Sequence, residues 1–176
     1  MASKSSRSII NFIVLLRVLS AFLIIISPLW GFLVFEFIDY WDAHFFINVA
    51  KTKWSYYQKL DKRLDVLGFL AMVLVGLTYG VFGFLLSLLI FRLIGQLLYE
   101  IVKKQLVLTA FPNLIEVFYI WFILLESSNQ FVLMFLFAVK LIQEGFLHYF
   151  WPEYLRKNGY PAIIQAFGVK NKINWD

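Results

Sequence analysis

The chain contains no cysteine, so it can form no disulfide and can offer neither a thiolate nucleophile nor a thiolate zinc site. Charged residues are also scarce, at 15% of the 176 residues, against roughly 25% in an ordinary soluble domain. Any metal must therefore take oxygen or imidazole ligands, and water is not the main solvent around this protein.

Apolar residues predominate instead: 61% of the residues are hydrophobic and 20% are aromatic. Apolar runs of about 20 residues are long enough to cross a hydrocarbon core about 30 Å thick. The pattern predicts an all-α integral membrane protein, a single domain built as a bundle of about six transmembrane helices. The predicted spans are 8–26, 29–49, 57–77, 81–102, 106–125 and 130–150, followed by a cytoplasmic tail over 151–176.

The connections between these spans differ in charge. Those near Ser27, Gly80 and Ser128 contain turn-forming residues and no Lys or Arg. The remaining connections and the two ends carry Lys4, Arg7, Lys51, Lys53, Lys59, Lys62, Arg63, Lys103, Lys104, Arg156, Lys157, Lys170 and Lys172. Because Lys and Arg concentrate in cytoplasmic loops, both termini are predicted to be cytoplasmic. The net charge of +5 needs no nucleic acid as a partner, and we expect the inner membrane of a prokaryote as the location.

Four aspartates flank one predicted cytoplasmic loop. Asp39 and Asp42 are three residues apart, and Asp61 and Asp65 are four residues apart, so each pair shares a helix face. Antiparallel packing of the two helices would bring the four carboxylates into one pocket, where their repulsion requires a cation. The pattern predicts a site for Mg²⁺ or Mn²⁺, with two ions as the arrangement suited to holding a diphosphate.

The two aspartate pairs carry a resemblance to a known family. Their order resembles the signature of the CDP-alcohol phosphotransferases, which reads D-x2-D-G-x2-A-R-x8-G-x3-D-x3-D and lies on the second and third of six transmembrane helices. Asn11, Ile13 and Arg17 also match the opening N-x-[IL]-T-x-x-R of that family's first helix, with Val14 in place of threonine. The resemblance covers most of the chain.

The chain also differs from this signature. Ala43, Phe46, Ile47 and Tyr57 stand where Gly, Ala, Arg and Gly are usual, and the gap between the aspartate pairs is one residue longer. In the family these positions admit the cytidine nucleotide, so the differences fall on the donor side of the site. The positions of the metal ligands are kept.

The resemblance implies a membrane phosphotransferase of phospholipid synthesis. Such an enzyme moves a phosphatidyl-type group from a CDP-linked lipid donor to an alcohol acceptor, with CMP as the leaving group. It implies metal ligands at Asp39, Asp42, Asp61 and Asp65, with Asp65 also acting as the catalytic base. It further implies a homodimer as the assembly.

Two basic residues are predicted to bind substrate. Arg92 lies deep in the span 81–102 and Lys103 lies at its end, where each would contact a substrate phosphate. An arginine inside a span also pairs with Glu116 or with a backbone carbonyl when its role is structural, and for Arg92 that alternative stays open.

A polar stripe marks the last span. Lys140, Glu144 and His148 follow at intervals of four residues, so they share one helix face. The stripe is predicted to face the bundle interior, either as an ion pair or as a path for protons or ions.

Other functions fit the same residues. A non-catalytic relative or a small membrane transporter would use the acidic cluster to bind metal or protons. Membrane prenyltransferases also hold diphosphates through aspartates and Mg²⁺, but they are larger and have more helices. In the plainest interpretation the aspartates are solvated loop carboxylates balanced by the neighbouring Lys and Arg side chains.

Overall fold

The computed structural model describes residues 4–102, 104, 106–146, 150, 153–154 and 157. Over these residues the protein is all-α, and they contain no strand. The chain divides into two compact units, unit 1 on Met1–Gly68 and Lys157–Asp176 and unit 2 on Phe69–Arg156.

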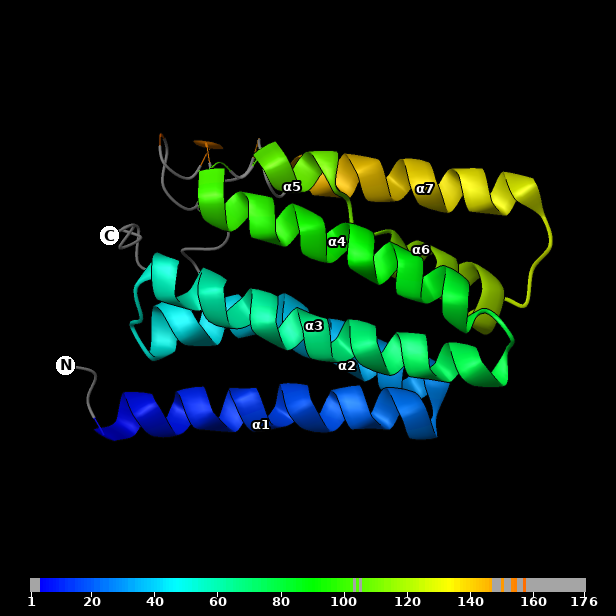
Figure 1. The fold of residues 1–176 in the computed structure, drawn as a ribbon. Helices are drawn as coiled ribbons and strands as arrows, with labels where there is room; N and C mark the ends of the chain where they lie inside the picture. The colour runs from blue at the N-terminus through cyan, green and yellow to red at the C-terminus, as the bar shows by residue number, and fades with distance from the viewer. Residues whose placement is uncertain are drawn as a thin grey trace. The chain divides into compact units, whose positions relative to one another are not determined.

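Unit 1 is built on α1 (Lys4–Ile26), α2 (Pro28–His44) and the first part of α3 (Trp54–Thr78). Only Ser27 separates α1 from α2, and Pro28 opens α2 because the first helical position needs no intrahelical N–H donor. The two helices therefore pack as antiparallel neighbours (Figure 1). A π-helical turn, η1 (Phe45–Val49), continues α2 towards the loop before α3.

A hydrophobic cluster fills the loop end of unit 1. We call it the Tyr57 cluster; its buried members are Ile10, Ile13, Phe46, Ile47, Ala50 and Tyr57. The half-buried side chains of Ala43 and Trp54 pack against it. The cluster fixes the start of α1 against the end of α2 and η1, which sets the position of the aspartates on α2.

Unit 2 contains the rest of α3, then α4 (Phe82–Val102), the short α5 (Leu106–Ala110), α6 (Leu114–Tyr119) and α7 (Gln130–Gly145). A second π-helical turn, η2 (Ile120–Leu124), continues α6. The α5 and α6 helices each contact both α4 and α7 (Figure 1). The side chain of Asn129 caps α7 by accepting a hydrogen bond from the backbone N–H of Phe131 at 2.9 Å.

The predicted single helix over 106–125 is wrong in one respect, because it is interrupted at Phe111–Asn113. Pro112 explains the interruption, since proline has no N–H to donate and disfavours the helical conformation of the residue before it. Helices occupy the other five predicted spans, and the last is described as α-helix through Gly145. Most of the predicted tail over 151–176 lies outside the described residues.

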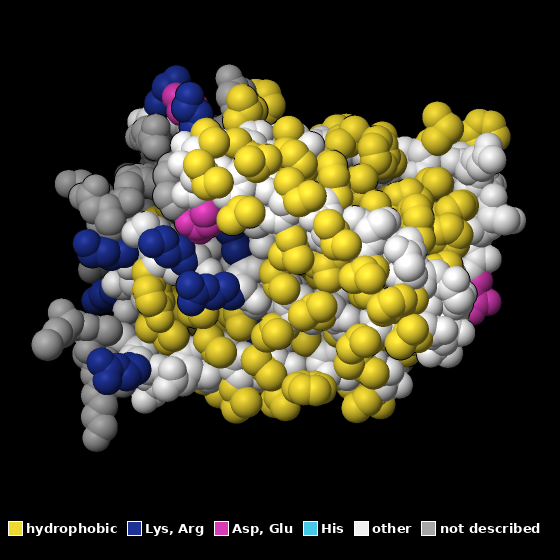
Figure 2. Space-filling model, viewed as in Figure 1, with side chains coloured by type: hydrophobic (Ala, Val, Ile, Leu, Met, Phe, Trp, Pro, Cys, Tyr) yellow, Lys and Arg dark blue, Asp and Glu magenta, His cyan; other side chains and the backbone are white. Residues whose placement is uncertain are grey.

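Three segments are long and apolar enough to cross a membrane, within the part of the chain that the structure describes. They are Ser6–Ile26, Phe82–Val102 and Leu106–Leu124. Hydrophobic side chains cover much of the visible face of each unit (Figure 2), and Phe131 is 82% exposed. Large apolar surfaces of this kind suit lipid better than water, as expected for an integral membrane protein.

Candidate acidic site

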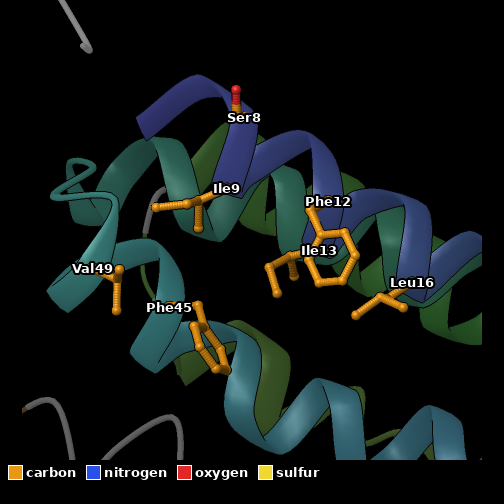
Figure 3. Close-up of a pocket in the computed structure, with 7 residues that line it drawn as sticks. All are labelled: Ser8, Ile9, Phe12, Ile13, Leu16, Phe45 and Val49. Carbon is orange, nitrogen blue, oxygen red and sulfur yellow. The ribbon is translucent and has the colours of Figure 1, made fainter. Parts of the chain in front are cut away.

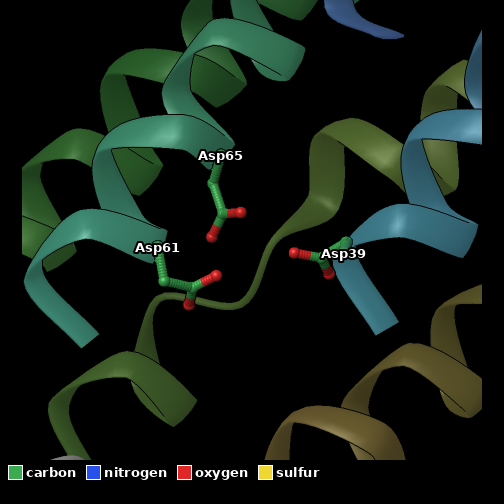
Figure 4. Close-up of side chains that lie close together, drawn as sticks. All are labelled: Asp39, Asp61 and Asp65. Atoms are coloured by element: carbon green, nitrogen blue, oxygen red, sulfur yellow. The ribbon is translucent and has the colours of Figure 1, made fainter. Parts of the chain in front are cut away.

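The four predicted aspartates lie together in unit 1. Asp39 and Asp42 project from α2, while Asp61 and Asp65 project from one face of α3. Carboxylate oxygens of Asp39, Asp61 and Asp65 all lie within 4.8 Å of one another, and Figure 4 shows the three side chains pointing towards one another. We call these three residues the acidic triad. Helix periodicity and antiparallel packing bring them together, as the spacing predicts.

Arg17 of α1 is the centre of this group. Its guanidinium is fully buried and forms ion pairs of 2.5 Å with both Asp39 and Asp65. Asp42 and Asp61 are farther away, at 3.8 and 4.0 Å. Arg17 is not among the predicted site residues, and the signal that marks it is an arginine inside the first apolar span.

A stack of two further residues positions Arg17. The guanidinium carbon lies 4.4 Å from the centre of the Phe35 ring, which is a cation–π contact. The ring in turn rests against Gly68 of α3, where an added Cβ would lie 2.2 Å from the ring edge. A glycine at position 68 is therefore what lets Phe35 lie under Arg17.

Asp42 differs from the other three aspartates, because it is 1% exposed and lies outside the triad. The Tyr57 hydroxyl donates a hydrogen bond to its Oδ1 at 2.8 Å. The Tyr57 ring is held in turn by Phe46 and Trp54, with ring centres 5.5 and 5.6 Å away. The hydrophobic cluster thus determines the orientation of one carboxylate at the acidic site.

The charges at this site do not balance. Four carboxylates surround one guanidinium, so three negative charges are left over if all four aspartates are ionised. Asp42 Oδ2 and Arg17 Nε are both buried and have no hydrogen-bond partner among the described residues. An oxygen-only donor set with surplus negative charge fits a hard divalent cation such as Mg²⁺ or Mn²⁺, with the triad oxygens close enough to share one ion.

An apolar groove lies beside the Tyr57 cluster, between α1 and η1. Its volume is about 430 Å³. The residues that line it are Ser8, Ile9, Phe12, Ile13, Leu16, Phe45 and Val49 (Figure 3). Leu16 is the neighbour of Arg17 in sequence, so the groove follows the same helix as the centre of the acidic site.

Of the two predicted substrate-binding residues, Arg92 lies among the described residues. Arg92 belongs to α4 of unit 2, where its Nη1 donates to the carbonyl oxygens of Phe111 at 2.6 Å and Leu108 at 3.4 Å. The backbone-carbonyl alternative is the one that the structure displays for Arg92. Lys103 lies outside the described residues.

The predicted stripe on the last span is present as far as it is described. Lys140 and Glu144 are buried, and Lys140 Nζ lies 3.7 Å from Glu144 Oε1. His148 lies outside the described residues. The ion pair of the stripe is therefore confirmed within unit 2.

Comparison of this chain with protein-family models, with curated proteins and with solved structures finds no match. The resemblance to the CDP-alcohol phosphotransferases therefore rests on the residues quoted above, and functional arguments rest on the site itself.

Proposed function

We propose that the protein is a metal-dependent membrane phosphotransferase similar to the CDP-alcohol phosphotransferases. The observation that carries this proposal is the convergence of Asp39, Asp61 and Asp65 from two helices, with surplus negative charge. The reaction transfers a phosphatidyl-type group from a CDP-linked lipid to an alcohol, with release of CMP. The proposed donor is thus a lipid of the membrane in which the protein lies.

The acidic triad is the proposed metal site. When bound, Mg²⁺ or Mn²⁺ would neutralise charge on the transferred phosphate and orient it. Asp42 stands beside the triad, held by Tyr57, and its Oδ2, which accepts no hydrogen bond and lies 3.8 Å from Arg17 Nε, would be the ligand for a second ion. The two-ion arrangement remains a prediction.

Asp65 is the proposed general base, which accepts the proton of the acceptor hydroxyl. In its ion pair with Arg17 this carboxylate is engaged, so proton transfer requires Arg17 to release it. A substrate phosphate is a suitable exchange partner, because charge-assisted pairs between arginine and phosphate are strong and often bidentate. Arg17 then contacts the phosphate while Asp65 faces the hydroxyl.

The lipid donor would lie along the apolar groove of α1 and η1, which offers only aliphatic and aromatic side chains apart from Ser8. Donor recognition is expected to differ from that of the family. Phe46, Ile47 and Tyr57, which replace signature residues, all pack inside the Tyr57 cluster, and Ala43 packs against it. The proposed layout has six spans and both termini in the cytoplasm, so the site opens at headgroup depth on that side. The proposed assembly is a homodimer in the inner membrane of a prokaryote.

One observation favours a second function. Arg17 provides a cation at the centre of the aspartates, as expected of a non-catalytic relative or a small transporter that binds metal or protons at this site. Turnover separates the two functions, because only the first predicts CMP release.

The test uses the purified protein in lipid nanodiscs. Mn²⁺ binding is followed by electron paramagnetic resonance, and CMP release is measured with CDP-diacylglycerol and a panel of alcohols. Asp61→Asn should lose metal, because a neutral amide cannot offset the charge of the cation. Asp65→Asn should retain at least one metal ion, since the other aspartates remain, and lose about 10²–10⁴-fold in transfer rate.

Glu126→Gln is the matched control, since Glu126 is an exposed carboxylate outside the site. It should behave like the wild type in both measurements. Metal binding without CMP release from any alcohol would favour the second function. No Mn²⁺ binding by the wild type would contradict the phosphotransferase and the metal-binding form of the second function.

A further inference from the structure

The interruption between α5 and α6 lies in a segment that is otherwise apolar enough to cross a membrane. Arg92 Nη1 donates to the Phe111 carbonyl in the interruption at 2.6 Å and to the Leu108 carbonyl of α5 at 3.4 Å. The Leu108 carbonyl also accepts from the backbone N–H of Phe111. Gly95 of α4 permits this approach, because an added Cβ there would lie 2.3 Å from Phe111 Cβ. Two residues of α4 therefore accommodate the interruption: Arg92 by hydrogen bonds and Gly95 by its lack of a side chain.

A charged network surrounds this interruption. The backbone N–H of Asn113 donates to Glu144 Oε1 at 3.1 Å, and its side-chain Nδ2 donates to Glu116. Lys140 Nζ lies 2.5 Å from Glu116 Oε2, and Arg92 Nη1 lies 3.7 Å from Glu144 Oε2. Two cations therefore face two carboxylates, and the network is neutral when all four groups are ionised.

Several polar atoms of this region are buried and form no hydrogen bond with the described residues. Arg92 Nε and Asn113 Oδ1 belong to side chains that are only 6% and 3% exposed. Gln96 Nε2 on α4 and Thr109 Oγ1 on α5 are also buried atoms that form no hydrogen bond with the described residues, although these two residues are half-buried. Unsatisfied polar atoms are costly anywhere in a protein interior, and most of all at membrane depth.

A molecule that hydrogen-bonds with these four atoms must offer both acceptors and donors. Arg92 Nε and Gln96 Nε2 can only donate, Asn113 Oδ1 can only accept, and the Thr109 hydroxyl can do both. An added ion would leave a net charge in the balanced network, which is unfavourable in a low-dielectric region. A neutral group that both donates and accepts, namely a hydroxyl or water, meets these requirements.

We propose that the α5–α6 interruption is a hydrated polar site that takes a small neutral hydroxylic molecule, of which water is the simplest. The site is independent of the acidic site and of the function proposed for it. Its hydration gives Glu116, Lys140 and Glu144 access to water inside a segment long enough to span a membrane.

Thiol reactivity tests the proposal, because the chain has no cysteine of its own and the background is zero. The reactive species is the thiolate, which forms in water and not in lipid. Thr109→Cys and Gln96→Cys are introduced one at a time into the full chain in nanodiscs. Each is treated with methyl methanethiosulfonate, a small neutral reagent that also enters membranes.

Leu97→Cys is the matched control, because Leu97 neighbours Gln96 on α4 and is 64% exposed on the apolar surface. The reagent reaches this position through lipid, where the thiol stays protonated. We expect both site cysteines to react at least about tenfold faster than the cysteine at position 97. If both react no faster than the control, the site is dry and the proposal is overturned. Two reporters on different helices guard against the misfolding of one variant.

Discussion

The Arg17 guanidinium has no exposed surface and lies within 4.0 Å of all four aspartates, so it holds the acidic site together through charge. Removing one partner of a buried ion pair leaves the other charges uncompensated. A divalent cation at the proposed site would replace this positive charge, so Arg17 and the metal would compete for the same carboxylates.

We predict that Arg17→Met lowers the free energy of unfolding by about 3–5 kcal/mol when divalent ions are chelated. Adding Mn²⁺ should recover more stability in this variant than it adds to the wild type, because ligand binding to the folded state stabilises it and the guanidinium no longer competes. Thermal unfolding in detergent, with and without chelator, measures both effects.

Arg63→Met is the control for that experiment, since Arg63 is exposed on α3 and should change stability little. An equal Mn²⁺ effect in Arg17→Met and the wild type would show that Arg17 and the metal do not share ligands.

The hydroxyl of Tyr57 provides a second prediction at this scale. Tyr57→Phe removes the donor to Asp42 Oδ1 and keeps the ring contacts with Phe46 and Trp54. We expect a loss of about 1–3 kcal/mol in unfolding free energy, the usual cost of a buried acceptor left unsatisfied. Tyr56→Phe is the neighbouring control, because Tyr56 is 51% exposed. Equal stability of the two variants would mean that the hydrogen bond contributes nothing.

At the scale of helices, the contact between α2 and α3 depends on the glycine at position 68, which has no side chain. Gly68→Ala places a Cβ 2.2 Å from the Phe35 ring, so the ring and the Arg17 guanidinium above it must shift. We expect a destabilisation of about 1–3 kcal/mol from this overpacking, together with weaker Mn²⁺ binding. Denaturation in detergent and metal titration are the two measurements.

Gly83→Ala is the matched control, because an added Cβ there meets nothing within 4 Å. In α4 this change should be neutral or slightly stabilising, since alanine is the better helix former. If Gly68→Ala is as well tolerated as Gly83→Ala, the stack of Gly68, Phe35 and Arg17 does not position the site.

The interrupted helix shows what periodicity alone fails to predict. Residues 106–125 have the apolar content of one span, and Pro112 was the local signal against an unbroken helix. A helix at membrane depth tolerates such a proline only where other groups satisfy the freed carbonyls. Here Arg92 does so from α4, about 20 residues earlier in the chain.

At the scale of the whole molecule, the proposed topology is open to a direct test. Single cysteines at Ser128 and Lys53 report opposite sides of the membrane if six spans are present and both termini are cytoplasmic. In intact cells a membrane-impermeant maleimide should label Ser128→Cys and spare Lys53→Cys. Lysed cells should label both. The reverse pattern in intact cells would show that the layout is inverted.

The sequence alone was sufficient for the helical class of this protein and for the convergence of its aspartates. Apolar runs, Pro28 at the start of α2 and the spacings of Asp39 with Asp42 and of Asp61 with Asp65 are local features. The pitch of a helix converts such spacings directly into shared faces, so neighbouring antiparallel helices bring the faces together.

Only the tertiary structure decided which groups form ion pairs and hydrogen bonds with those carboxylates. Arg17 pairs with Asp65, which lies 48 residues later in the chain. Tyr57 orients Asp42, while the other three aspartates form the triad. Arg92 of α4 donates to a carbonyl in the interruption between α5 and α6. These contacts depend on how the helices pack, which involves shape and close approach at positions such as Gly68 and Gly95. No local periodicity encodes them, because the partners lie on different helices and their meeting is a property of packing.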